Sequence, residues 1–349
     1  MSVTRLPLRR YFSFSAPRLE RRRAEFALLL ALAVSLELAA GVGLAYVAGF
    51  SRVRAALGGF DWVWLAALAG ALVVSFVGYF YAYRGIHRVE GGPALSGRQM
   101  HAVVAAGFGG FLAHGGGALD KYALQAAGAS ENDAKARVAG LGGMEYLVLA
   151  IGGCGAAIVI LVSGLAAPPA DFTLPWAIIP VPAMLLGFWL AERYRSRFRD
   201  RGGWRGAVAT FIEAVHLIRE LCVRPRLWVW APTGMALFWA ADAFAVWAGL
   251  AAFGFRMDAA SLIVGYATGM VFTRRTGPLA GAGILALVLP LSLWYCGAPL
   301  AVAVAGVFAY RVLALWLPMP AALAFLPTLR TMGEQQISGA PPRTPRKAA

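Results

Sequence analysis

Long hydrophobic runs alternate along this chain with short polar segments in which most of the charged residues are collected. Several runs reach about 20 residues with at most one charge, the length that an α-helix needs to cross the core of a bilayer. The pattern predicts an all-α polytopic membrane protein with about eight transmembrane helices. The expected spans cover residues 26–50, 60–83, 139–166, 172–191, 228–253, 259–273, 280–296 and 298–326.

Two glycine-rich segments, at residues 107–117 and 276–283, interrupt this pattern. A membrane helix tolerates broken backbone only where protein or a water-filled cavity covers it. Paired interruptions in the two halves of a chain point to a buried binding site. We therefore expect a site between the two breaks. We also expect residues 99–119 to form a re-entrant or buried broken helix that enters from the cytoplasmic side.

Composition agrees with a membrane protein, since 60% of the residues are hydrophobic, 14% are charged and the mean hydropathy is +0.66. The net charge of +15 would suggest nucleic acid in a soluble protein. Here the charge lies beside apolar spans and no nucleic-acid-binding module accompanies it, so we expect no nucleic-acid partner. The three cysteines lie far apart without metal-ligand spacing, and we predict neither a metal nor a cofactor.

Arginine-rich segments predict the orientation of the chain. We expect one helical transmembrane domain at 24–329, between a disordered basic arm at 1–23 and a disordered basic tail at 330–349. Together with the basic segments 84–98 and 192–205, these ends predict a multi-pass protein of the inner (plasma) membrane with both termini in the cytoplasm. The main exceptions to this charge asymmetry are Arg52 and Arg54, between the first two spans.

An amphipathic pattern occupies residues 207–222. Its apolar face includes Val208, Phe211 and Ile218. The opposite face carries Glu213, His216 and Glu220. This arrangement predicts a helix that lies in the cytoplasmic interface.

The first glycine break continues into polar residues that are candidates for a head-group site. These are His114, Gly116, Gly117, Asp120 and Lys121. Glycines free backbone amides to face a ligand, and His114 could carry a proton. A tight turn with hydrated charges explains the same residues without a ligand, and both interpretations stay open.

The second break is preceded by Arg274 and Arg275, whose planar guanidinium groups suit a phosphate. Free amides near Gly281 and Gly283 would add hydrogen-bond donors. The alternative is an ordinary basic anchor at the end of the span 259–273.

Four charged residues lie deeper inside predicted spans, and a charge costs about 2.5–3.5 kcal/mol at a helix centre on insertion scales. They are Glu37, Glu145, Asp242 and Arg311. Pairing Arg311 with Asp242 or with Glu37 would offset that cost. These groups either line a polar path or form structural pairs between helices; Glu37 and Glu145 fit the structural role better.

Three stretches carry a further pattern, although the chain contains no recognisable catalytic motif. One runs from Gly115-Gly116-Gly117-Ala118-Leu119-Asp120-Lys121-Tyr122-Ala123-Leu124 through Gly128-Ala129-Ser130 to Arg137-Val138. The second runs from Gly265-Tyr266-Ala267-Thr268-Gly269 through Pro278-Leu279-Ala280-Gly281-Ala282-Gly283. The third runs from Gly297-Ala298-Pro299 through Ala305 to Tyr310-Arg311 and Trp316-Leu317-Pro318. Together they resemble the membrane region of lysylphosphatidylglycerol synthetases and their stand-alone flippase-like relatives.

The resemblance implies about eight helices with re-entrant pieces and translocation of a lipid or lipid-linked substrate. The family pattern at the second break ends in a Glu, where this chain has Ala286. The soluble aminoacyl-transferring domain is not expected here, so lysine transfer is not expected either.

The leading hypothesis is a flippase-like protein for an anionic lipid head group. Arg274, Arg275 and Lys121 would neutralise its phosphate, above a polar floor of Asp242 and Arg311. One rival is a non-transporting accessory subunit of an envelope glycosyltransferase or lipid-modifying enzyme. Another is a membrane enzyme that uses Asp120 and His114.

Overall fold

The structure is a computed structural model. It describes residues 23–93, 95–108, 116–165, 168–198, 204–228, 230–271, 283–325, 327–329 and 331–332. Within these ranges the chain is helical and contains no β-strand. The predicted all-α class is therefore confirmed.

Five described helical segments are long and apolar enough to cross a membrane, and a sixth is the bent pair Val34–Ala48 and Phe50–Gly58. The protein is thus a multi-pass membrane protein, as predicted. The segments contain α2 (Arg23–Ala48) with α3 (Phe50–Gly58), α4 (Trp62–Arg88), α7 (Glu131–Ser163), α8 (Ala170–Ile178) with α9 (Pro180–Phe198), α12 (Ala231–Ala252), and α15 (Leu300–Trp316) with α16 (Met319–Ala324).

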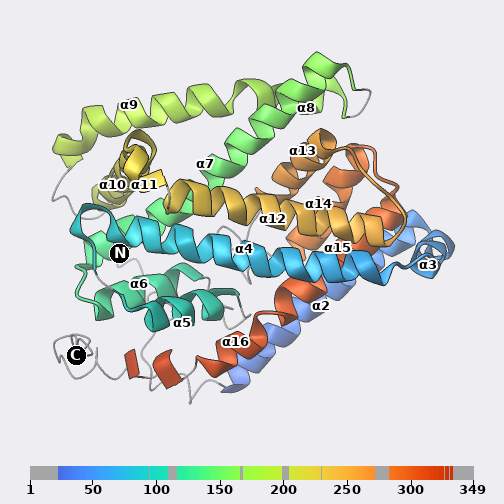
Figure 1. The fold of residues 1–349 in the computed structure, drawn as a ribbon, viewed down its shortest axis with the longest axis horizontal. Helices are drawn as coiled ribbons and strands as arrows, with labels where there is room; N and C mark the ends of the chain where they lie inside the picture. The colour runs from blue at the N-terminus through green and yellow to red at the C-terminus, as the bar shows by residue number, and fades with distance from the viewer. Residues whose placement is uncertain are drawn as a thin grey trace, which may run out of the picture.

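Helices α4 and α12 form the antiparallel centre of the bundle (Figure 1). At one end the amide of Asp61 donates to the carbonyl of Ala252, and at the other Gly85 lies against Ala231. About one turn further along the pair, a Cβ on Gly234 would lie 2.6 Å from the amide nitrogen of Ala82. Small residues let membrane helices approach this closely, so the pair packs backbone against backbone.

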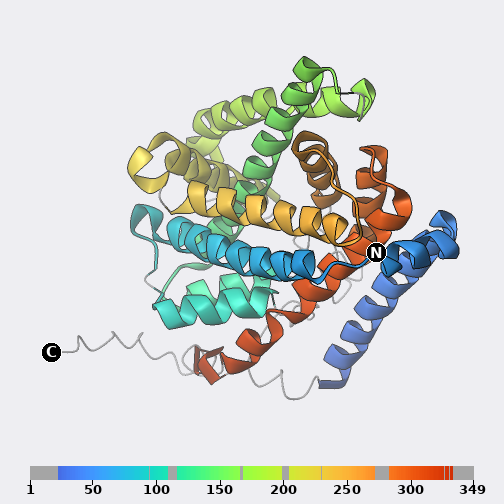
Figure 2. The ribbon, with the colours of Figure 1, turned by 45° about the vertical axis from the view of Figure 1, so that its right-hand side comes forward.

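These two helices define two ends of the molecule. We call the end with Arg88 and Ala231 the basic end, and the other the opposite end. The short helices α10 (Trp204–Val223) and α11 (Pro225–Trp228) lie at the basic end, and α3 lies at the opposite end (Figures 1 and 2). Basic residues of the α4 C-terminus and of α9, α10 and α11 gather at the basic end.

Two pairs of short helices enter the bundle from different ends. The first hairpin is α5 (Gly97–Phe108) with α6 (Gly116–Ala126), and the second is α13 (Ala259–Met270) with α14 (Ile284–Tyr295). Twelve helical residues span about 18 Å, well short of a bilayer core of about 30 Å.

The first hairpin leaves from the basic end, where α5 follows the turn after α4 and α6 leads into α7. The second leaves from the opposite end, where α13 follows the turn that begins at Phe253. In the second hairpin Gly269 packs against Leu289, and the hydroxyl of Ser292 donates to the carbonyl of Gly265 at 2.7 Å. The chain between the two helices of each hairpin, at 109–115 and 272–282, lies outside the described residues. The re-entrant interpretation of 99–119 therefore stays a prediction.

A buried arginine holds the start of α7 to the end of α4. The Arg137 guanidinium donates to the backbone carbonyls of Ile86, His87 and Val89 at 2.9–3.2 Å and to Asp133 at 2.9 Å. These carbonyls include the orphan acceptors that every helix leaves at its C-terminus. In the sequence Arg137 stood out only as part of the first motif stretch, and its role as a clamp on α4 was not predicted.

The expected amphipathic helix forms as α10, but its polar face does not lie in water. His216 and Glu220 are buried, whereas Phe211 is 66% exposed. Arg195 of α9 explains the difference, because it forms a bidentate pair with Glu213 at 2.7 and 3.0 Å and contacts the His216 ring. The sequence pattern predicted the helix and its two faces, but not that a neighbouring helix supplies partners to the polar face.

Candidate functional site

A buried carboxylate lies at the middle of the central helix. Asp242 is about 16 Å along α12 from its first residue and about 15 Å from its last, and it is 6% exposed. One of its oxygens, Oδ2, accepts a hydrogen bond from the Tyr266 hydroxyl at 2.5 Å and another from the Tyr310 hydroxyl at 2.7 Å. We call Asp242, Tyr266 and Tyr310 the Asp242 cluster.

The cluster joins three helices that are distant in the sequence, because Asp242 lies on α12, Tyr266 on α13 and Tyr310 on α15. Both tyrosines are buried, at 1% and 4% exposure. Charge-assisted hydrogen bonds of this kind are about twice as strong as neutral ones, so they offset part of the cost of a carboxylate in the membrane.

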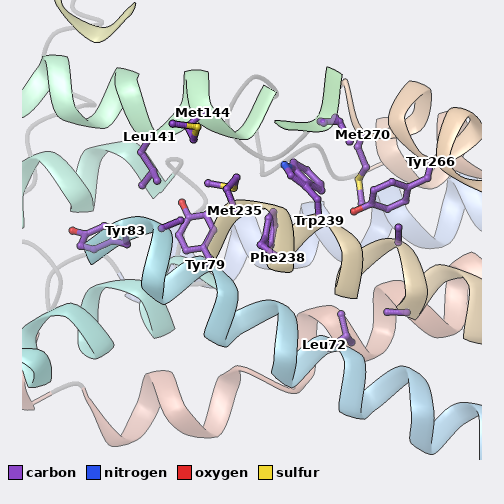
Figure 3. Packing of buried hydrophobic residues seen from close by; sticks show 14 of the residues in the cluster. Leu72, Tyr79, Tyr83, Leu141, Met144, Met235, Phe238, Trp239, Tyr266 and Met270 are labelled. Atoms are coloured by element: carbon purple, nitrogen blue, oxygen red, sulfur yellow. The ribbon is translucent and has the colours of Figure 1, made fainter. Parts of the chain in front are cut away.

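Both hairpins reach α12 at adjacent residues. Phe108, the last residue of α5, packs edge-on against Phe238, with ring centroids 6.1 Å apart. Tyr266 of α13 packs against Trp239, at 5.8 Å. Figure 3 shows Phe238, Trp239 and Tyr266 within this buried layer. The hairpins that enter from different ends therefore meet the same turn of the central helix, next to Asp242.

Helix α7 lies beside this junction. The Trp239 indole donates to the backbone carbonyl of Glu145 at 2.8 Å, and the Tyr146 hydroxyl donates to the carbonyl of Val271 at 3.3 Å. At the start of α6, a Cβ on Gly117 would lie 3.1 Å from the Val138 side chain. Thus described residues next to both glycine breaks contact one stretch of α7.

Of the two partners that the sequence allowed for Arg311, Asp242 and Glu37, the structure shows Glu37. Their side chains form an ion pair between α15 and α2, in which both are partly buried. The neighbouring residue Tyr310 points instead to Asp242, because consecutive helical residues project in different directions. Arg311 is therefore not an ion-pair partner of Asp242 and lies in a separate charged contact.

Gly283 lies near that second contact. It has a φ of +79° and precedes α14, and a Cβ there would lie 3.1 Å from the Cβ of Leu36 in α2. A left-handed backbone of this kind favours glycine, which explains the residue without a ligand. Its position nevertheless brings one flank of the second break next to the Glu37–Arg311 pair.

The two charges of the first break have different environments. Asp120 is 5% exposed, so it is not the hydrated surface residue that the ligand-free interpretation requires. Lys121 is half-buried and donates to Glu131 at 3.0 Å, at the start of α7. Glu131 also pairs with Lys135, so Lys121 belongs to a small ion-pair network at the protein surface.

Four predicted site residues, His114, Arg274, Arg275 and Gly281, lie outside the described residues. Gly116 is the first residue of α6. Among the described residues, Asp242 contacts the second hairpin and lies one turn of α12 from Phe238, which the first hairpin contacts. Lys121 and Arg311 lie in separate ion pairs. Sequence reasoning missed the roles of Tyr266 and Tyr310, which no spacing along the chain could have connected to Asp242.

The described part of the chain contains no cluster of His, Cys, Asp or Glu side chains that could hold a metal ion. No protein-family model matches the sequence, and a search of curated proteins finds no match.

Proposed function

We propose that this protein is a flippase-like membrane protein that binds or translocates an anionic phospholipid or lipid-linked head group between its two hairpins. One observation carries the proposal: two broken helical pairs enter from different ends and reach the same turn of α12, beside buried Asp242. Discontinuous helices that meet near the bilayer midplane form the substrate sites of many transporters.

The charged residues supply the chemistry of this proposal. Arg274 and Arg275, in the segment that joins α13 to α14, would neutralise the phosphate. Asp242, held by its two tyrosines, would form the polar floor. Lys121 would contribute after exchanging its ion pair with Glu131 for the ligand.

We propose that six segments cross the membrane and that both hairpins are re-entrant. The predicted count of eight treated 259–273 and 280–296 as separate spans, but the described helices there are only 12 residues long. Six crossings, like eight, leave both termini on one side. The concentration of arginines supports placing the basic end in the cytoplasm, and the inner membrane as the location.

We also propose kinship with the membrane region of lysylphosphatidylglycerol synthetases. Its support is the three motif stretches, with their paired glycine breaks. Ala286, which replaces the family Glu, lies on α14 and is buried among apolar side chains. Asp242 is then a buried carboxylate one helical turn from Phe238, and mechanisms that need the family Glu do not apply.

A translocation assay tests the proposal. Purified protein is reconstituted in vesicles that contain fluorescent phosphatidylglycerol, and a membrane-impermeant reductant quenches the label in the outer leaflet. We expect the protein to raise the quenched fraction above that of protein-free vesicles, and Arg275→Ala and Asp242→Asn to remove most of the increase. Tyr46→Phe, on an exposed surface of α2, is the matched control.

Equal quenching in protein-containing and empty vesicles, across a panel of anionic and lipid-linked probes, would refute transport. Equal rates for wild type, Arg275→Ala and Asp242→Asn would refute the proposed site while leaving transport intact. Each variant needs an unchanged helical content by circular dichroism to count.

The accessory-subunit alternative has one observation in its favour. The apolar window of the α8–α9 segment is only 6% buried within the chain, compared with 72% for α12. Such an exposed helical segment offers a surface for another membrane protein. Co-purification of one stoichiometric envelope enzyme, together with no translocation by the isolated protein, would favour this function.

A further inference from the structure

Helix α3 turns sharply away from the span that precedes it. The axes of Val34–Ala48 and Phe50–Gly58 differ by 101°, and the turn occurs at Gly49, with a φ of +89°. Helix α2 has 26 residues, about 39 Å, and a mostly apolar sequence, so it can cross a bilayer core without α3. A helix at about a right angle to it then lies along the membrane surface. The bend thus places α3 flat at the opposite end of the molecule (Figure 2).

The sides of α3 differ in character, as an interfacial helix requires. Phe50, Val53 and Leu57 follow the i, i+3, i+7 spacing and share one face. Val53 packs inward on a cluster with Leu44 and Val304, whereas Phe50 and Leu57 remain more than half exposed. The protein covers one edge of this face and leaves the rest for acyl chains.

Aromatic residues on both sides of α3 mark the same level. Tyr46, near the end of α2, is 74% exposed, and Trp62, at the start of α4, is 73% exposed. Tyrosine and tryptophan concentrate at the head-group level of a bilayer. Since α3 connects these two helix ends, it lies at the depth of lipid phosphates.

Two arginines of α3 are free to meet those phosphates. Arg52 and Arg54 are both exposed, and neither has an ion pair or a side-chain hydrogen bond with any other residue that the structure describes. Arg52 lies on the side away from the apolar face, and Arg54 borders Phe50, where its long stem can lie along the acyl region. A planar guanidinium is suited to bind phosphate oxygens in a bidentate manner.

We propose that α3 is a binding site for anionic phospholipid in the leaflet at the opposite end, with Arg52 and Arg54 on the phosphate and Phe50 and Leu57 in the acyl layer. A lipid fits better than a soluble anion, because exposed apolar side chains adjoin the charges. The site accounts for the two arginines of α3, which depart from the charge asymmetry of the chain. It holds or fails independently of the transport proposal.

The test uses the full chain in nanodiscs, with the three native cysteines replaced by Ala and a spin label on Ser51→Cys. Collision with oxygen and with a water-soluble nickel chelate gives the depth of the label. We expect the label to lie at the depth of the head groups. We also expect its motion to be slower in nanodiscs of phosphatidylglycerol than in nanodiscs of phosphatidylcholine. Each basic residue near an anionic surface changes lipid affinity roughly fivefold. When the fraction of phosphatidylglycerol in the nanodisc is titrated, the double change Arg52→Gln, Arg54→Gln should therefore lower the affinity read from the slowing of the label roughly 25-fold.

Two control variants make the result specific. Arg52→Lys with Arg54→Lys keeps the charges and should retain most of the response. Arg193→Gln with Arg197→Gln removes the same charge from α9 and should leave the label unaffected.

The proposal would be overturned if the collision rates placed the label in bulk water. It would also be overturned if the motion of the label were equal in phosphatidylglycerol and phosphatidylcholine. An equal response to inorganic phosphate in phosphatidylcholine nanodiscs would also overturn it, because the site would then bind a soluble anion.

Discussion

Tyr266 and Tyr310 both donate to one oxygen of Asp242, so removing their hydroxyl groups measures how far the buried carboxylate depends on them. In Tyr266→Phe or Tyr310→Phe the ring remains and the packing is kept. Each change should lower the free energy of unfolding by about 1.5–3 kcal/mol, the usual contribution of a hydrogen bond to a charged group.

The double variant tests the reasoning more sharply. After one donor is lost, the remaining hydroxyl matters more, because Asp242 is 6% exposed and water cannot easily replace the donor. The double variant should therefore lose more stability than the sum of the two single losses, by at least about 0.5 kcal/mol, as for residues in one network. In an Asp242→Asn background the acceptor is neutral, and each Tyr→Phe change should cost only about 0.5–1.5 kcal/mol.

Reversible unfolding in mixed micelles, followed by circular dichroism as SDS is added, measures these free energies. Tyr46→Phe is the control and should fall within about 0.5 kcal/mol of wild type, because Tyr46 is exposed. Strictly additive losses at Tyr266 and Tyr310, or equal losses in the Asp242→Asn background, would refute the dependence of the carboxylate on its tyrosines.

Three further predictions use the same unfolding assay or thiol chemistry. Arg137→Lys should cost about 3–5 kcal/mol, because one ammonium cannot serve Asp133 and the carbonyls of Ile86, His87 and Val89 together. A loss below about 1 kcal/mol would contradict this role. Gly234→Ala should cost about 1–3 kcal/mol by forcing α4 and α12 apart, whereas Gly43→Ala, with open space around it, should be neutral. Burial raises the pKa of the Cys296 thiol to about 12, so at pH 8 this thiol should resist alkylation until the protein is unfolded. Peptide mass spectrometry locates the alkylated cysteines. Rapid labelling of Cys296 in the folded protein would disprove this prediction.

Much of the architecture follows from the chain alone. Long apolar runs have few structural options in a bilayer, because every backbone amide and carbonyl must be satisfied within a helix. The runs that became α4, α7, α12 and α15 were therefore predictable as spans. The bounds of α12 agree within three residues, but α7 begins eight residues before the predicted span and α15 ends ten residues before its predicted end. Asp242 was also recognisable, since a charge in the middle of such a run stands out whatever its neighbours are.

Partners across helices were not predictable. The sequence allowed Arg311 to pair with Asp242 or with Glu37, and hydropathy cannot choose between them. It also predicted that α10 lies in the interface, but not that Arg195 of α9 covers part of its polar face. Both outcomes depend on which helices become neighbours, and that is set by packing over the whole bundle.

The sequence alone determined a helical membrane protein, its main spans, its charge asymmetry and its two glycine breaks, because these follow from the local cost of placing polar groups in lipid. Tertiary structure decided that the two hairpins enter from different ends and converge on one turn of α12. It also joined Asp242 to Tyr266 and Tyr310 and turned α3 across the end of α2. These features depend on close contacts between distant segments, such as the glycine packing of α4 on α12, which no local pattern encodes.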